Sequence, residues 1–189
     1  MLSRRRLLAA SGAALVAGCG SGPDGRTAIE SDGGGEPLVV RPDAFEDEGT
    51  IPRTYTGVGE DVSPPITIVP GPEATETFAV VLDDPSANEF VHWLIWNVPG
   101  DTEEIPEGVP RTETVDSLGG ARQGTNDFGE VGYRGPLPPE GDAAHTYRFT
   151  TYAVDTTLEL AAGAGRGALE SALEGHVLDR YPFVGTFAR

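Results

Sequence analysis

Short apolar runs separated by turn residues fill the chain from Pro37 to its end. The two strongest runs, residues 78–82 and 90–96, are rich in β-branched and aromatic residues and are bounded by Pro, Asp and Asn, which is typical of strands. Weaker runs of the same kind occupy residues 38–40, 66–69, 147–154 and 183–187. This pattern predicts a mainly β domain in which two antiparallel sheets pack face to face.

One segment near the C-terminus has the periodicity of a helix instead. Between residues 166 and 179, apolar side chains recur at spacings of three and four, with Glu170 and Glu174 between them. The apolar positions are Ala168, Leu169, Ala172, Leu173 and Val177. We expect an amphipathic helix of about three turns over these residues.

Residues 90–96 form a run that is apolar on both faces of the expected strand. Successive side chains of a strand point to opposite sides, so the even-numbered residues, His92 among them, share one face. The odd-numbered residues, Val91, Trp93 and Ile95, share the other face, and we expect Trp93 and Ile95 to pack between the sheets. An imidazole in so apolar a run should be largely buried and must find a hydrogen-bond partner.

The N-terminus differs from the rest of the chain. Arg4, Arg5 and Arg6 precede a weakly apolar stretch of about ten residues, which is too short to span the roughly 30 Å hydrocarbon core of a bilayer as a helix. Residues 1–18 are therefore interpreted as an export signal. The paired arginines resemble the twin-arginine address.

Cys19 is the only cysteine, so no disulfide can form within the chain. The residues Val16, Ala17 and Gly18 before it resemble a lipobox, in which the cysteine is lipidated and becomes the new N-terminus. Residues 19–36 hold few apolar side chains and are predicted to be a flexible tether. The tether would join a membrane lipid at Cys19 to a ligand-binding domain over residues 37–189. The alternative is a soluble secreted protein in which Cys19 has no role.

The charge of the chain is strongly negative. Its 13 basic residues, all arginine, stand against 30 acidic ones, for a formal net charge of -17. Nucleic-acid binding depends on neutralising phosphates, so this balance argues against a nucleic-acid partner. It argues equally against an electrostatic hold on anionic lipid head groups. We interpret the acidity as a solvated surface that stays soluble in concentrated salt. A halophilic source is therefore a hypothesis, which full folding without added salt would contradict.

Histidine is scarce in the chain, which has three: His92, His145 and His176. His145 precedes a strand-like run, and Tyr147 faces the same way two residues later. The two imidazoles and the phenol would converge if the strands of His92 and His145 are neighbours. Asp84 ends the run before His92, and its carboxylate would accept a proton from an imidazole and fix its tautomer. Taken singly, each histidine is as readily a satisfied core residue, and Asp-Pro is a common strand end.

A loop rich in Gly and Pro occupies residues 132–139. Its glycines permit close approach of the backbone to a ligand. The alternative is a long turn without a binding role.

Four segments occur in the order, and near the spacing, typical of the phosphatidylethanolamine-binding protein (PEBP) family: residues 84–87, 90–93, 132–136 and 145–147. From about residue 38 to 189, the chain resembles the prokaryotic branch often labelled Raf kinase inhibitor-like. The resemblance implies a sandwich of two antiparallel sheets with a minor helix, and a small pocket for phosphate-like anions. By residue matching, the pocket would be lined by Asp84, His92, His145 and Tyr147, with the Gly135 and Pro136 backbone at its rim.

The chain departs from the family pattern at three positions. Ser86 stands where the family usually has a second aspartate, and Asn88 stands where a proline is usual. Leu137 replaces a frequent cysteine. The first two departures change the electrostatics and shape of the pocket rim, whereas the third changes only packing.

The expected function is binding of a small anionic or phosphorylated ligand without a cofactor. The imidazoles and Tyr147 would supply donors to the anion, and Asp84 would orient an imidazole. One alternative is a hydrolase using Ser86, His92 and Asp84, although the chain has no Gly-x-Ser-x-Gly elbow. A second is a metal-dependent enzyme using Asp84, His92 and His145. A third is a surface inhibitor or interaction module whose protein partner is unknown.

Replacing Cys19 by Ser should block lipidation, because the hydroxyl cannot take the place of the thiol at the end of a lipobox. The variant should appear in the medium or stay unprocessed. Fractionation of cells followed by a salt wash measures this directly. Equal membrane association of Cys19→Ser and the unchanged protein would contradict the lipid anchor.

Overall fold

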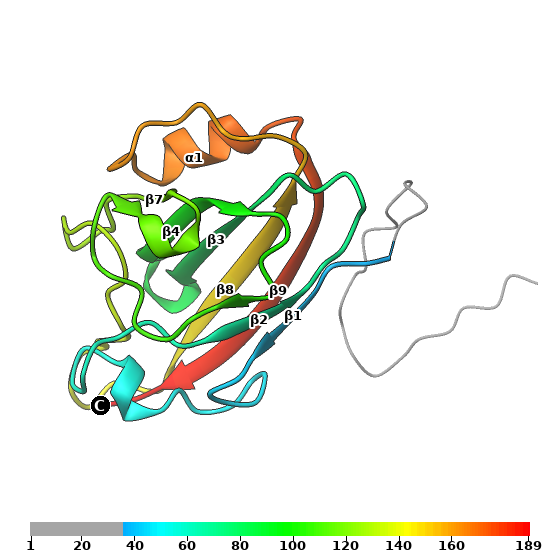
Figure 1. The fold of residues 1–189 in the computed structure, drawn as a ribbon. Helices are drawn as coiled ribbons and strands as arrows, with labels where there is room; N and C mark the ends of the chain where they lie inside the picture. The colour runs from blue at the N-terminus through cyan, green and yellow to red at the C-terminus, as the bar shows by residue number, and fades with distance from the viewer. Residues whose placement is uncertain (1–35) are drawn as a thin grey trace, which may run out of the picture. The chain divides into compact units, whose positions relative to one another are not determined.

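The structure is a computed structural model that describes residues 36–189. The predicted export signal, Cys19 and all but the last residue of the predicted tether lie outside the described residues. Two antiparallel sheets and one helix make up the described part (Figure 1). Within residues 36–189, no helix is long and apolar enough to span a bilayer.

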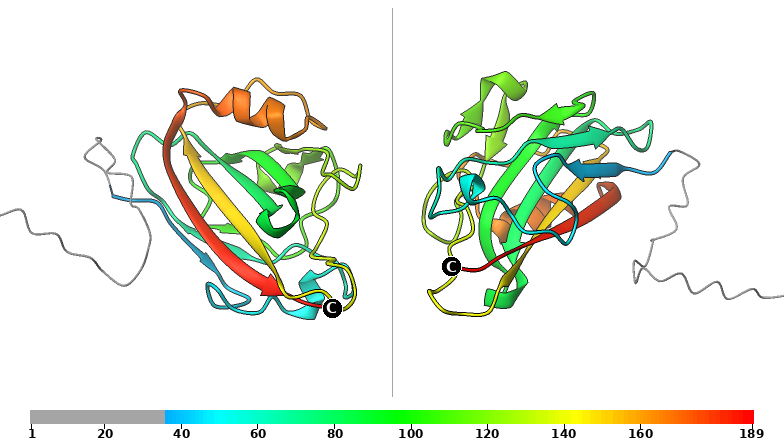
Figure 2. Two further views of the ribbon diagram at one scale, coloured as in Figure 1. Left: turned by 180° about the vertical axis from the view of Figure 1, so that it is seen from behind. Right: turned by 90° about the horizontal axis from the view of Figure 1, so that it is seen from below.

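The larger sheet has the strand order β6-β7-β4-β3-β8-β9. In that order the strands are Thr114–Val115, Ala121–Gln123, Phe90–Pro99, Thr77–Asp84, His145–Val154 and Val177–Phe187. The smaller sheet has the order β1-β2-β5, with strands Val39–Pro42, Ile66–Val69 and Glu104–Ile105. Helix α1 spans Arg166–Leu173, and short 3-10 helices span Arg53–Tyr55 (η1), Pro85–Ala87 (η2) and Asp116–Leu118 (η3). The strands β8 and β9 run side by side along their length (Figure 2). The predicted sandwich with a minor helix is confirmed.

The main core lies between the two sheets. Side chains from the small sheet meet Trp93 and Ile95 of β4 there, and both of these are fully buried, as predicted. A second apolar cluster on the other face of the large sheet is covered by Leu169 and Leu173 of α1. Every residue of β3 is buried, and its apolar side chains pack alternately into the core between the sheets and into the cluster beneath α1.

The predicted alternation of residues 90–96 is wrong at Val91. Val91 packs in the helix-side cluster, whereas Trp93 packs in the core between the sheets. The pairing with β3 shifts between Leu82, which faces Trp93, and Asp83, which faces Val91. His92 is therefore the extra residue of a β-bulge, and a bulge changes which face the following side chains occupy.

The predicted helix is too long. It ends at Leu173, and Val177 already begins β9. Gly175, with a φ of 79°, takes a left-handed conformation that stops a helix. His176 follows it outside the helix, and its Nδ1 lies 2.8 Å from Oδ1 of Asp155.

A buried carboxylate fastens α1 to the large sheet. The Asp83 side chain, only 2% exposed, receives two bonds from Arg148 of β8, at 3.0 and 2.6 Å. Arg166, the first residue of α1, adds a third bond at 3.0 Å. Burying a carboxylate away from water costs free energy unless cationic partners pair with it. The three bonds to Asp83 therefore hold β3, β8 and α1 in one arrangement.

Replacing Ile95 by Ala should lower the free energy of unfolding by about 2–5 kcal/mol, because it opens a cavity between the sheets. A urea titration measures the loss. The matched control is Val69→Ala in β2, since Val69 is 41% exposed and should change stability little. An Ile95→Ala loss no larger than that of the control would show that β4 does not hold the core together.

Candidate functional site

The carboxylate of Asp84 closes the end of β3 and points away from Asp83, because neighbouring residues of a strand face opposite sides. Its Oδ1 accepts a bond from the Ser86 amide at 2.8 Å, which caps η2. Its Oδ2 accepts a bond from Nδ1 of His145 at 2.6 Å. Asp84 thus orients an imidazole, as predicted, but the imidazole belongs to His145 and not to His92.

His92 is 3% exposed and is oriented by a backbone carbonyl. Its Nδ1 lies 2.8 Å from the carbonyl oxygen of Arg134, and the Arg134 amide donates to the His92 carbonyl at 2.9 Å. A carbonyl oxygen only accepts, so Nδ1 of His92 carries the proton. The backbone of Gly135 also lies close enough to the His92 ring to act on its pKa, and Nδ1 is the ring nitrogen with a direct bond to Arg134.

Burial lowers the pKa of His92, and this effect outweighs the opposing ones of the Arg134 carbonyl and Asp84. Asp84 favours the charged imidazolium of His92, but less strongly than burial disfavours it. Desolvation disfavours the charged form of a buried imidazole. His92 is neutral near pH 7 in the ligand-free protein.

Tyr147 lies between the two imidazoles. Its ring is 5.2 Å from that of His92, edge-on at 88°, and 6.4 Å from that of His145, stacked at 25°. Burial, together with the charge of Asp84, raises the pKa of Tyr147 far above its ordinary value, so it remains a neutral phenol. The strands β4 and β8 are not neighbours, because β3 separates them. The three rings converge because β3 ends at Asp84 between them.

Gly135 and Pro136 belong to a loop that packs on the protein itself. A Cβ on Gly135 would lie 2.4 Å from the carbonyl oxygen of Tyr55, so only glycine fits. The carbonyl of Pro136 accepts a bond from the Gly57 amide at 2.9 Å. The close approach that requires glycine at position 135 is therefore to the backbone at Tyr55.

Aromatic side chains cover His92 from outside. Phe128, which is 37% exposed, lies 5.3 Å from the His92 ring and 4.9 Å from that of Phe90. The guanidinium of Arg134 stacks 5.6 Å above Phe128. Phe128 is not among the predicted site residues, although it is an isolated aromatic residue close to the polar residues Asn126, Asp127 and Glu130.

Ser86, His92 and Asp84 do not form a hydrogen-bonded triad in the described residues. The Ser86 hydroxyl accepts a bond from the Thr146 amide at 3.0 Å and is bonded to no imidazole in the described chain. Among residues 36–189, no three His, Cys, Asp or Glu side chains are grouped to hold a metal ion. Asp84 and His145 are in contact, but the ring of His92 is oriented elsewhere.

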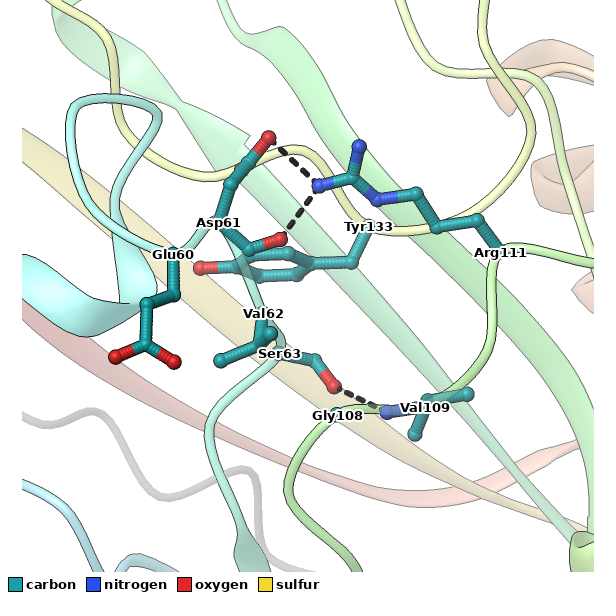
Figure 3. Close-up of a pocket in the computed structure, with 8 residues that line it drawn as sticks. All are labelled: Glu60, Asp61, Val62, Ser63, Gly108, Val109, Arg111 and Tyr133. Atoms are coloured by element: carbon teal, nitrogen blue, oxygen red, sulfur yellow. Dashed lines mark hydrogen bonds and ion pairs between the residues drawn. The ribbon is translucent and has the colours of Figure 1, made fainter.

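A cavity of about 300 Å³ lies beside this site and shares none of the predicted residues (Figure 3). Its walls include Glu60, Asp61, Ser63, Val109, Arg111 and Tyr133. Two contacts join the residues drawn there: Arg111 pairs with Asp61 at 2.6 Å, and Ser63 accepts from the Val109 amide at 2.9 Å. We place the candidate site at the histidines, because His92, His145 and Tyr147 converge there around Asp84.

Comparison with known proteins identifies the family. The family model for phosphatidylethanolamine-binding protein matches residues 41–188. A UPF0098 protein of Pyrococcus abyssi is 43% identical over 159 residues, which cover 83% of this chain and 89% of that relative. The chain belongs to the phosphatidylethanolamine-binding protein family.

Two crystal structures have a similar fold. A homologue of phosphatidylethanolamine-binding protein from Chlamydia trachomatis is 28% identical with a TM-score of 0.72, over 82% of this chain and 99% of that one. YbcL of E. coli, a member of the mammalian PEBP family, is 24% identical with a TM-score of 0.74, over 80% of this chain and 98% of that one. Both confirm the arrangement of sheets on which the site is built.

Replacing Gly135 by Ala should destabilise the protein by about 1–3 kcal/mol, because the new methyl group would force the loop away from Tyr55. The control is Gly167→Ala in α1, where a Cβ meets no atom within 4 Å. That change should be neutral or stabilising, since alanine favours helix. Thermal and urea unfolding of both variants measure the difference. Equal stability of the two would contradict the tight contact at Gly135.

Proposed function

We propose that this protein is an exported, lipid-anchored binding protein for a small phosphate-type anion, and not an enzyme. The observation that carries the proposal is the convergence of His92, His145 and Tyr147 around Asp84 at the end of β3. Both imidazoles are held through Nδ1 by the protein. Membership of a family named for a phospholipid supports a ligand with a phosphate group.

Which ring nitrogen of each histidine carries a proton decides which atoms could donate a hydrogen bond to an anion. Nδ1 of His92 and Nδ1 of His145 donate to a carbonyl and a carboxylate, so Nε2 is the nitrogen that each can offer a ligand. In a neutral imidazole of this tautomer, Nε2 is an acceptor. Donation to an anion therefore requires Nε2 to take up a proton. The neutral phenol of Tyr147 can donate without such a change.

The proposed anchor is a lipid on Cys19, reached after removal of residues 1–18, and the tether would carry the domain outside the cytoplasm. In a chain of net charge -17, an anion needs local donors such as these imidazoles. Neither a nucleic-acid partner nor a cofactor is part of the proposal. The bond between the Ser86 hydroxyl and the Thr146 amide supports binding over hydrolysis at Ser86, because no imidazole among residues 36–189 bonds that hydroxyl.

The affinity for sulfate should fall as pH rises. Burial lowers the pKa of His92 in the free protein, whereas a bound anion favours the charged form and raises it. At pH values between these two pKa values of His92, binding takes up one proton, so the affinity falls by up to roughly tenfold per pH unit. It should level off at pH values below the lowered pKa of free His92. Sulfate is the probe, because phosphate has its own ionisation near pH 6.

Matched variants in the same calorimetric titration assign the effect. His92→Ala and His145→Ala should each weaken sulfate binding by roughly tenfold to a hundredfold, the equivalent of one charge-assisted hydrogen bond of about 1.5–3 kcal/mol. Tyr147→Phe should weaken it less. His176→Ala is the control, since its side chain is 47% exposed and bonds Asp155. If all folded variants bind sulfate equally, the anion does not use this site.

A further inference from the structure

Asp61 is joined to the candidate site by its side chain, although it lies 73 and 74 positions before the residues it bonds. Its Oδ1 accepts a bond from the Gly135 amide at 2.7 Å. Its Oδ2 accepts one from Nη1 of Arg134 at 2.7 Å and pairs with Nη2 of Arg111 at 2.6 Å (Figure 3). The Asp61 side chain is 13% exposed, so these bonds are largely shielded from water.

The backbone of Asp61 is held in an uncommon conformation. Its φ is 60°, in the left-handed region that a residue with a side chain enters at a cost. Its amide donates to the Thr54 carbonyl at 3.0 Å, and its own carbonyl accepts a bond from Arg111 at 2.5 Å. Strain of this kind persists only where the surroundings fix the residue. At Asp61 these bonds aim the carboxylate at the loop.

The bond to Gly135 determines which way one peptide group points. The carbonyl of Arg134 and the amide of Gly135 belong to the same peptide plane, and in a trans peptide they point in opposite directions. Asp61 holds the amide on one side of this plane. The carbonyl on the other side accepts the proton of Nδ1 of His92 at 2.8 Å. The negative carboxylate also polarises the peptide and strengthens the carbonyl as an acceptor.

We propose that Asp61 is a positioning residue that sets the tautomer of His92 through the Arg134–Gly135 peptide. Asp61 thereby keeps Nε2 of His92, and not Nδ1, as the nitrogen presented to a ligand. The consequence for ligands rests on the proposed anion-binding function. The tautomer itself does not, because it is a property of the ligand-free protein.

Nitrogen NMR of the histidine rings in ligand-free protein near neutral pH tests the proposal. The unchanged protein should show His92 with a protonated Nδ1 and an unprotonated Nε2. A His92 that carries its proton on Nε2 overturns the proposal without recourse to any variant.

Two variants separate the side chain of Asp61 from its backbone. Asp61→Gly removes the carboxylate but suits a positive φ, and should populate the second tautomer and weaken sulfate binding about tenfold, as expected for one hydrogen bond. Asp61→Asn keeps an oxygen for the Gly135 amide and should retain most of the original tautomer. Glu48→Gly is the control, because Glu48 is exposed and has a φ of 66° elsewhere in the chain. It should leave the His92 signals unchanged.

The two readouts distinguish the failure of each proposal. A folded Asp61→Gly protein with an unchanged His92 tautomer overturns the role of Asp61, whatever sulfate does. A changed tautomer in a protein that binds no sulfate, even before substitution, supports the role of Asp61 and contradicts the anion-binding function.

Discussion

Two adjacent carboxylates at the end of β3 are the constraint on which the rest of the structure depends. Asp83 and Asp84 are 1% and 3% exposed and face opposite sides of the sheet. A carboxylate buried without a partner would cost several kcal/mol, so each must have its partners in place. Asp83 pairs with Arg148 and Arg166 and so holds α1 against the large sheet. Asp84 pairs with His145 and so orients the imidazole of the candidate site. The end of β3 therefore positions α1 on one face of the large sheet and the candidate site on the other.

The two imidazoles of the site are held by different kinds of acceptor, which gives them different electrostatic surroundings. His145 bonds one carboxylate, and its Nε2 lies 3.9 Å from a second, that of Asp142. His92 bonds a neutral carbonyl beneath aromatic rings. The ring of His145 is thus flanked by two carboxylates, whereas burial lowers the pKa of His92.

Features fixed by local pattern could be predicted from the sequence. The strands and the burial of Trp93 and Ile95 follow from their apolar runs, and the resemblance supplied Asp84, His145 and Tyr147. The bulge at His92 could not be predicted, because it depends on the register with a different strand. Asp61 was missed because the partners of its side chain are 50 to 74 positions away, and hydrogen bonds between distant loops leave no periodicity.

The covering of the His92 ring has a consequence for the kinetics of the binding that we propose. His92 is 3% and Tyr147 0% exposed, and Phe128 lies against the His92 ring with Arg134 stacked on it. An anion bound as we propose would reach the ring after these side chains move aside, so the frequency of that movement would limit the association rate. The same movement would limit release. Slow exchange of this kind suits a protein that retains its ligand over one that follows rapid changes in concentration.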